Sequence, residues 1–312
     1  ATFRRAATAD DFENAEIPAT TAEHEAPAPR MTDNFFGTPE QDALRRDFTI
    51  NAILQHPLTG ELIDPYQGKQ DLELRRLRVV NKETFVEDPL RLYRAVQFVA
   101  RFGLDVEGET LELLKAMTTN GSLDELPPER ITDELKKLLL ADKPSTGFEL
   151  LRSIGVIERY YPELAKLKET PQEPEWHPEG DVWIHTMMVV DQAALIATRE
   201  KMNDEQRLLC VLGSLCHDLG KALTTAPLEK DGVIRMRSLG HEKAGIEPTR
   251  ELLSRLTFGQ DVNLFCEHVA HYHLQPTALY REFEKQKLSE GGYENAVRKF
   301  LKKILPYDWK IF

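Results

Sequence analysis

Apolar residues recur at helical spacing through most of the chain beyond residue 88. In residues 88–102, Leu92, Ala95, Val96 and Val99 fall on one face of a helix. The same spacing predicts further helices at 110–117, 129–141, 145–154, 181–200, 204–217, 241–256, 259–273 and 290–304. The pattern therefore predicts a mainly α fold.

The residues before 88 follow a different pattern. FTINAIL (48–54) and a segment through Leu62 and Ile63 flank the turn sequence HPLTGE, which predicts a hairpin-like strand pair. Residues 9–40 are rich in Ala, Thr, Pro and acids without periodicity, so we expect a long exposed loop. Residues 168–180 are crowded with Pro and charge, and we expect a domain boundary there. These features predict the remnant of a mixed sheet followed by an all-helical body.

Composition narrows the class of protein. The chain has 312 residues, 41% of them hydrophobic, which is enough for two domains. No apolar run approaches the length of a membrane span, and the three cysteines form no CxxC pair. These features favour a cytoplasmic protein with reduced thiols and no membrane partner. The net charge of −12 argues mildly against a nonspecific nucleic-acid binder, although the basic residues within 69–101 can form a local basic surface.

One segment carries a donor–acceptor pair suited to a nucleobase. Asp88 and Arg91 are three residues apart, so on a helix they share a face. A carboxylate accepts and a guanidinium donates, and together they can mimic a base-pairing edge. Arg94 and Arg101 continue the Arg91 side, where phosphates can bind. Taken alone, this helix fits a solvated face with ion pairs better.

Histidines gather in the second half of the chain. Seven of the nine histidines lie between 177 and 273, and the other two are His24 and His56. His217 and Asp218 end an apolar helix where Leu219–Gly220 breaks the turn, so both can converge on a cation. Imidazole and carboxylate ligands suit Mn²⁺, Ni²⁺, Co²⁺ or Fe²⁺, and Mg²⁺ suits an oxygen-rich site. A bound metal would activate water and polarise a phosphate oxygen, and Lys221 could lie near that phosphate.

Four segments follow one another with short spacers: RRDFTINA (45–52), DPYQGKQDL (64–72), EDPLRLYRAVQFVARF (87–102) and LPPERITDELKKLL (126–139). The series resembles the class II tRNA nucleotidyltransferase and poly(A) polymerase family, and its CCA-adding branch more than its polyadenylating branch. The resemblance implies tRNA, CTP and ATP as partners. It places Arg46 and Asp47 at the sugar and phosphates and Asp88 and Arg91 at the base, with Arg94 also in the nucleotide site.

WHPEGDVWIHT (176–186) and LCHDLGKA (215–222) resemble the HD phosphohydrolase domain of bacterial CCA-adding enzymes. This resemblance implies phosphatase, 2′-nucleotidase and 2′,3′-cyclic phosphodiesterase activity, with His185, His217 and Asp218 as metal ligands. A later aspartate is also expected. Asp261 is a candidate by position, although a helix-capping role after Gly259 fits it equally well. His241 and His271 are expected to complete a second metal position or to contact phosphate.

The two resemblances together divide the chain into three parts. Residues 1–87 are expected to form a partial α/β nucleotidyltransferase head, 88–167 a helical nucleotide-recognition and neck domain, and 168–312 an all-helical HD domain. Trp176, Trp183 and Tyr161 are expected to pack in the core or an interface rather than to stack on bases.

The family's glycine-rich loop and paired-aspartate strand, which hold Mg²⁺ for nucleotidyl transfer, find no counterpart here. Asp10–Asp11 has no strand or glycine loop before it. We therefore expect that these 312 residues alone do not add nucleotides. Three alternatives stay open: a noncatalytic tRNA-binding module, a polyadenylating relative, and a split enzyme whose aspartates lie on another chain. The oligomeric state is not indicated.

Overall fold

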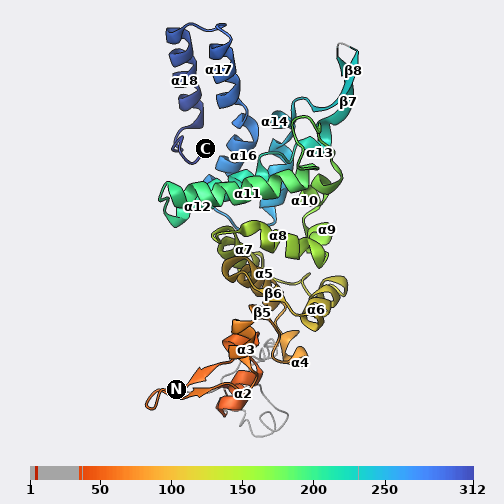
Figure 1. The fold of residues 1–312 in the computed structure, drawn as a ribbon, viewed down its shortest axis with the longest axis vertical. Helices are drawn as coiled ribbons and strands as arrows, with labels where there is room; N and C mark the ends of the chain where they lie inside the picture. The colour runs from red at the N-terminus through yellow and green to blue at the C-terminus, as the bar shows by residue number, and fades with distance from the viewer. Residues whose placement is uncertain (1–3, 6–34, 37, 231) are drawn as a thin grey trace, which may run out of the picture. The chain divides into compact units, whose positions relative to one another are not determined.

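The computed structural model describes residues 4–5, 35–36, 38–230 and 232–312 (Figure 1). The chain divides into two compact units. The first contains the residues up to Arg91 together with Leu104–Leu113, and the second contains Leu92–Gly103 and Leu114–Phe312. Most of the loop expected at 9–40 lies outside the described residues, as does Asp10–Asp11. The domain boundary expected at 168–180 falls inside the second unit.

The first unit combines short strands with short helices. Its strand pairs are β1 (Arg4–Arg5) with β2 (Phe35–Phe36), β3 (Leu54–Gln55) with β4 (Leu62–Ile63), and β5 (Arg76–Leu77) with β6 (Asp105–Val106). Its helices are α2 (Pro39–Leu44), η1 (Thr49–Asn51), α3 (Gly68–Glu73) and α4 (Lys82–Phe85). The predicted hairpin is confirmed, because Leu54 pairs with Ile63 in antiparallel register. The strand expected over 48–54 is shorter than expected. Residues 49–51 form a 3₁₀ helix instead, and the strand begins only at Leu54.

A buried carboxylate links α3 to the strand that follows it. Asp71 is fully buried and accepts hydrogen bonds from Arg76 Nε at 2.6 Å, Arg78 Nε at 2.9 Å and Thr49 Oγ1 at 2.6 Å. A buried charge is tolerated when it is paired and hydrogen-bonded in this way. Asp71 in the DPYQGKQDL segment is therefore a structural residue of this unit.

The second unit is almost entirely helical, which confirms the mainly α prediction. Its first half contains most of α5 (Arg91–Phe102), the end of α6 (Gly108–Thr119), α7 (Pro128–Leu139), α8 (Pro144–Ser153), α9 (Val156–Tyr160), α10 (Pro162–Ala165) and η2 (Lys166–Glu169). Its second half contains α11 (Val182–Arg199), α12 (Asp204–Cys216), α13 (Lys221–Thr224), β7 (Thr225–Lys230), β8 (Val233–Ser238), α14 (His241–Ala244), α15 (Ile246–Ser254), α16 (Gln260–Tyr272), α17 (Gln275–Glu284) and α18 (Glu290–Ile304). In the described part of the chain, none of these helices has the length and apolar character that a membrane span requires.

Three features of the second unit departed from the expected pattern. The helix predicted over 241–256 is two helices, α14 and α15, which meet at Gly245. Helix α17 and the β7–β8 hairpin were not predicted. Pro227 and the charged residues of the two strands obscure the alternation that normally reveals a hairpin.

Two close approaches bring the later helices together. Gly213 in α12 leaves room for α16, because a Cβ there would lie 3.0 Å from Phe265 and 3.1 Å from Val269. Gly220 leaves room for the turn from α14 to α15, because a Cβ there would lie 2.1 Å from the carbonyl oxygen of His241. Small residues at these points let the ends of α12, α14 and α16 meet.

Candidate metal centre

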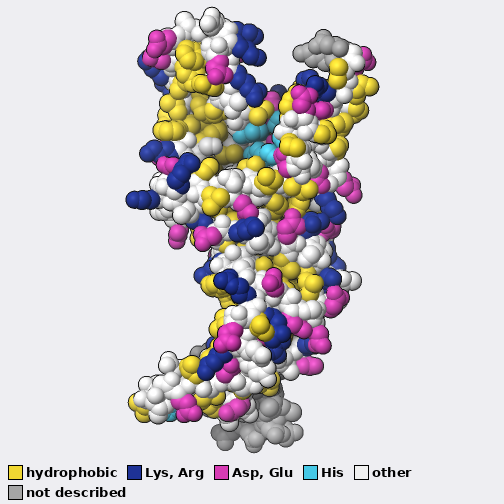
Figure 2. Space-filling model, in the orientation of Figure 1, with side chains coloured by type: hydrophobic (Ala, Val, Ile, Leu, Met, Phe, Trp, Pro, Cys, Tyr) yellow, Lys and Arg dark blue, Asp and Glu magenta, His cyan; other side chains and the backbone are white. Residues whose placement is uncertain are grey.

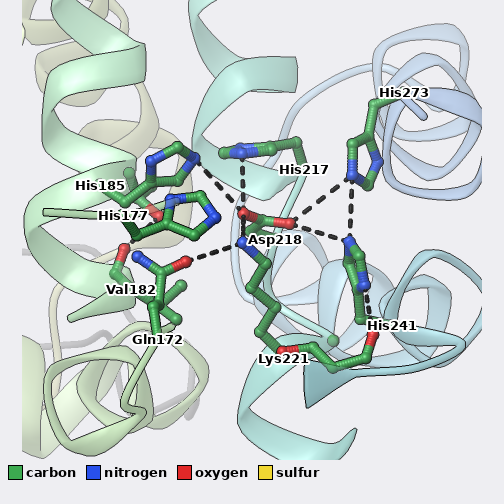
Figure 3. Close-up of polar contacts among 12 residues, drawn as sticks. Gln172, His177, Val182, His185, His217, Asp218, Lys221, His241 and His273 are labelled. Carbon is green, nitrogen blue, oxygen red and sulfur yellow. Dashed lines mark hydrogen bonds and ion pairs between the residues drawn. The ribbon is translucent and has the colours of Figure 1, made fainter. Parts of the chain in front are cut away.

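Side chains from five elements converge on the carboxylate of Asp218 (Figure 3). Asp218 lies in the turn after α12, directly following His217, the residue that ends this helix. The other imidazoles come from α11 (His185), the first residue of α14 (His241) and the residue that ends α16 (His273). The convergence of His185, His217 and Asp218 is the arrangement that the sequence motifs implied.

The two oxygens of Asp218 face different pairs of histidines. Oδ2 lies 3.0 Å from His217 Nε2 and 3.6 Å from His185 Nε2. Oδ1 lies 3.2 Å from His241 Nε2 and 3.6 Å from His273 Nε2. Asp218 therefore takes part in two groups of ligand atoms, one with His185 and His217 and one with His241 and His273. Each group provides two imidazoles and one carboxylate, a donor set that suits a divalent transition metal.

Backbone carbonyls orient three of the imidazoles. His217 Nδ1 lies 2.7 Å from the Ser214 carbonyl oxygen, and His241 Nδ1 lies 2.6 Å from that of Ser238. His273 Nδ1 lies 3.0 Å from the Ala270 carbonyl oxygen. Because a carbonyl only accepts, each Nδ1 carries a proton, which leaves Nε2, the ring nitrogen that faces Asp218, as the atom available to ligate a metal.

The resulting arrangement of lone pairs requires a cation or a proton. The Nε2 atoms of His241 and His273 face each other at 3.2 Å. Asp218 Oδ1 is buried and accepts no hydrogen bond from any of the described residues. Lone pairs that converge on a buried oxygen repel one another unless a positive charge lies among them. The residues present therefore fit a divalent metal.

A second carboxylate supports His185 from outside the group. Glu179 accepts from Nδ1 of His185 at 2.8 Å and from Nδ1 of His177 at 2.9 Å. A carboxylate behind a ligating imidazole fixes its ring and its tautomer. Burial raises the pKa of Glu179, but hydrogen bonds from His177, its own backbone and His185 lower it to about 2. Glu179 is consequently ionised at neutral pH and available for this role.

The ionisation of the central groups favours ligation. Burial raises the pKa of Asp218, but its close contacts with His217 and His241 and the charge of Lys221 hold that pKa well below its usual range. Burial and the proximity of His217 and His241 lower the pKa of His273 to about 4, against the attraction of Asp218. Burial also lowers the pKa of His241, but its close contact with the Asp218 carboxylate raises that pKa overall. His273 is thus neutral at pH 7, whereas His241 retains its proton to a higher pH than usual.

Lys221 lies beside the same carboxylate. Its Nζ is 2.7 Å from Asp218 Oδ2 and donates to Gln172 Oε1 at 2.8 Å. The side chain is buried but still forms part of the wall of the pocket. It therefore places a positive charge where an anionic substrate can reach it.

The structure does not bring Asp261 into this group. Asp261 is exposed in the first turn of α16, whereas His273 follows the last turn. Twelve residues of helix separate them, which is about 18 Å. His271 is also outside the group, and its ring packs on Tyr272.

His273 occupies the place expected for His271, and a signal in the sequence could have identified it. Position 273 is in helical phase with the buried positions Cys266, Val269 and Ala270, while His271 is about 100° out of phase with Ala270.

An open pocket gives access to the histidines. Its volume is about 340 Å³, and Figure 2 shows the histidines in a hollow of the surface. The lining residues include all the groups around Asp218, together with Trp176 and Arg237. A pocket of this size admits a small phosphate ester.

The predicted nucleotide-binding residues lie elsewhere, mostly in the first unit. Asp88 lies in the bend before α5, which begins only at Arg91, so the two residues do not share a regular helix as expected. The Arg91 guanidinium instead donates to the carbonyl oxygens of Thr84 at 2.5 Å and Arg45 at 2.7 Å. The segment around Asp88 is therefore tied directly to the RRD segment.

The RRD segment itself is held by short-range contacts. Asp47 is buried and accepts from the backbone N–H of Phe48 and from the Asn51 amide, both at 2.9 Å. Arg46 is exposed and pairs with Asp42 at 2.8 Å. Arg94, one turn into α5, lies over the ring of Phe98.

Comparison with known proteins shows which family this chain belongs to. A family model described as the poly A polymerase head domain matches residues 1–78, one described as the probable RNA and SrmB-binding site of polymerase A matches 103–168, and one for the HD domain matches 182–297. The multifunctional CCA protein of Actinobacillus pleuropneumoniae serotype 5b is 43% identical over 239 residues, which are 76% of this chain and 55% of that protein. The chain belongs to the multifunctional CCA protein family.

Other members and solved structures agree with this membership. The multifunctional CCA protein of Laribacter hongkongensis is 43% identical over 219 residues, covering 70% of this chain and 50% of that protein. The chain thus spans about half the length of the multifunctional CCA proteins that it matches. A tRNA-processing enzyme solved with CTP has a TM-score of 0.55 at 23% identity, covering 88% of this chain and 63% of that one. A tRNA nucleotidyltransferase with a primer tRNA and an ATP analogue has a TM-score of 0.54 at 24% identity, covering 89% and 69%. At these identities the structures support the fold alone.

Proposed function

We propose that this chain serves the addition and repair of the CCA end of tRNA, and that its HD domain is a metal-dependent phosphohydrolase. The reactions of that domain would be phosphatase, 2′-nucleotidase and 2′,3′-cyclic phosphodiesterase reactions. The observation that supports the hydrolase most strongly is the convergence of four imidazoles on the single carboxylate of Asp218. Fold similarity alone would not support an activity, because function depends on the site.

The residues of the pocket have separate roles in this proposal. His185, His217 and Asp218 would hold one divalent cation, and His241 and His273 with the other oxygen of Asp218 would hold a second. A bound cation supplies a water of lowered pKa and withdraws charge from a phosphate oxygen. Lys221 would bind the substrate phosphate, since its ammonium group lies at the pocket wall. The metal in use would be Mn²⁺, Ni²⁺, Co²⁺, Fe²⁺ or Mg²⁺.

A metal-dependent assay tests the hydrolase. The chain is stripped of metal and each divalent cation is restored in turn, and hydrolysis of 2′,3′-cyclic AMP and the bound metal are measured. We expect the double variant His217→Ala, Asp218→Ala to lose both metal and turnover. His268→Ala is the matched control, because this histidine lies on α16 outside both ligand groups and bonds to the Leu264 carbonyl. Full turnover by the double variant would refute the hydrolase.

The transferase half of the proposal concerns residues that lie mostly in the first unit. We propose that Arg46, Asp47, Asp88, Arg91 and Arg94 bind CTP and ATP, and that Mg²⁺ supports nucleotidyl transfer in the complete enzyme. Support comes from the contact of Arg91 with Arg45, which places the two motifs side by side. The test is equilibrium dialysis with CTP and ATP. We expect Asp88→Ala to weaken binding while Asp142→Ala, a fully exposed control, leaves it unchanged. Equal binding by both variants would contradict the assignment, and a strong preference for ATP would favour a polyadenylating relative.

A further inference from the structure

We propose that Trp176, flanked by Arg235 and Arg237, is a base-binding wall of the HD pocket and makes the site selective for phosphate esters that carry a nucleobase. The inference rests on the proposed hydrolase function and adds specificity-determining residues to it. Sequence reasoning expected Trp176 to be packed. The structure leaves it 53% exposed, so the indole is open to solvent.

Trp176 lies in the same pocket as the candidate metal ligands. Trp176 and Arg237 line the same pocket as the histidines and Lys221. The next residue along the chain, His177, packs its ring edge-on against His185, with 4.9 Å between the ring centroids. A phosphate ester bound at Asp218 would therefore extend its organic part towards this wall.

Hydrogen bonds connect the segment that carries Trp176 to the β7–β8 hairpin. The backbone N–H groups of Trp176 and His177 both donate to the Glu173 carbonyl oxygen, at 3.0 and 2.9 Å. The Glu173 carboxylate accepts from the backbone N–H of Met236 in β8 at 3.0 Å. The turn that carries Trp176 is thus fastened to the hairpin that carries the two arginines. Such preorganisation lowers the entropy lost when a ligand binds.

The two arginines give the wall its charge. The guanidinium carbons of Arg235 and Arg237 lie 5.2 and 5.7 Å from the Trp176 ring centroid. Arg235 also pairs with the Glu175 carboxylate. No acidic side chain among the described residues pairs with Arg237, and its buried Nε has no hydrogen-bond partner there. Both guanidinium groups lie over the indole ring, and the exposed part of the indole and the guanidinium planes are each surfaces on which a base can stack. The cation that lacks an acid partner attracts an anionic ligand.

The other two tryptophans differ from Trp176 in ways that set up the controls. Trp183 is 2% exposed and donates to Glu149 at 2.6 Å, so it is a structural residue. Trp309 is 63% exposed but does not line the pocket. Stacking on an indole tolerates any base, because every base has a π face. We therefore expect selection for the presence of a base rather than for its identity.

The test compares a substrate with a base and one without. Wild type, Trp176→Ala, Trp176→Phe and Trp309→Ala are assayed on 2′,3′-cyclic AMP and on glycerol 1,2-cyclic phosphate. We expect Trp176→Ala to raise the KM for 2′,3′-cyclic AMP about 5- to 150-fold, the range for the loss of one stacked base. Its KM for the glycerol ester and its kcat for both should stay unchanged. Trp176→Phe should restore most of the affinity, and Trp309→Ala should match wild type.

Binding to the metal-free chain gives a second readout. Adenosine 5′-monophosphate should quench the indole fluorescence of wild type and of Trp309→Ala, but not that of Trp176→Ala. The inference is overturned if Trp176→Ala keeps the wild-type KM for cyclic AMP, if it impairs both substrates equally, or if it keeps the quenching. If wild type hydrolyses neither substrate, the hydrolase proposal fails, and the quenching experiment alone then decides the base-binding wall.

Discussion

Gly220 is the position where a single methyl group should test how the candidate metal centre is assembled. Its backbone φ is −69°, which any residue adopts, so alanine there meets no backbone strain of its own. The obstacle is space. A Cβ at 220 would lie 2.1 Å from the His241 carbonyl oxygen and 2.5 Å from the Gly245 nitrogen. Ordinary contact needs more than 3 Å, so α14 would have to move by about 1 Å.

The size of the effect follows from which atoms are displaced. Overpacking a core usually costs about 1–3 kcal/mol, and the upper end applies here because the obstructing atoms are backbone. The displaced residue is His241, whose Nε2 lies 3.2 Å from Asp218. We therefore expect Gly220→Ala to destabilise the chain by about 3 kcal/mol and to weaken the metal position formed by Asp218, His241 and His273. The position with His185 and His217 should be affected less.

A graded series separates this geometry from a general loss of folding. At Gly245 a Cβ would meet the His241 carbonyl oxygen at 3.1 Å, so Gly245→Ala should give an intermediate effect. At Gly291 in α18 a Cβ meets nothing within 4 Å, and alanine there should be neutral or stabilising. Urea unfolding gives the stabilities, and calorimetric titration with Mn²⁺ gives the metal stoichiometry. Wild-type stability and full stoichiometry in Gly220→Ala would refute the close-packing argument.

Three further predictions follow from particular contacts. First, because Asp218 raises the pKa of His241, metal binding near neutral pH should release a proton, and metal affinity should fall as the pH falls. Calorimetry in buffers of different ionisation enthalpy measures the proton release, and metal binding without proton release would contradict the prediction. Second, burial raises the pKa of Tyr161 to about 12 and that of Tyr93 well above 10, so stability present below pH 10 should fall as the pH rises towards 12. Tyr161→Phe, which leaves the hydroxyl of Tyr93 without its 3.0 Å partner, should cost about 1–3 kcal/mol by urea unfolding, and the double Phe variant should be no worse. Third, Asp71→Ala should destabilise the first unit by about 3–5 kcal/mol, because two arginines lose their buried acceptor; unchanged urea unfolding would show the pairing to be dispensable.

Helical periodicity determined most of the second unit, because an amphipathic helix needs only a regular pattern of apolar residues. The helix expected over 290–304 has those bounds in the structure, and the one expected over 129–141 spans Pro128–Leu139. The β7–β8 hairpin escaped prediction because its stability comes from pairing between two charged strands, which no local pattern reveals. The break at Gly245 escaped for a related reason, since Gly220, in the turn between α12 and α13, packs against it from a distant part of the sequence.

The resemblance of the sequence to the HD phosphohydrolase domain predicted His185, His217 and Asp218 as metal ligands, and the structure brings these three side chains together. Only the tertiary structure decided which later residues join them. His273 faces Asp218 and Asp261 lies at the far end of the same helix, because the packing of α16 against α12 fixes one face and one end at the site. The same holds for Trp176. A tryptophan in a sequence favours a buried position in the core. The exposure of Trp176 in the pocket depends on the hydrogen bond between the β7–β8 hairpin and the turn that carries Trp176.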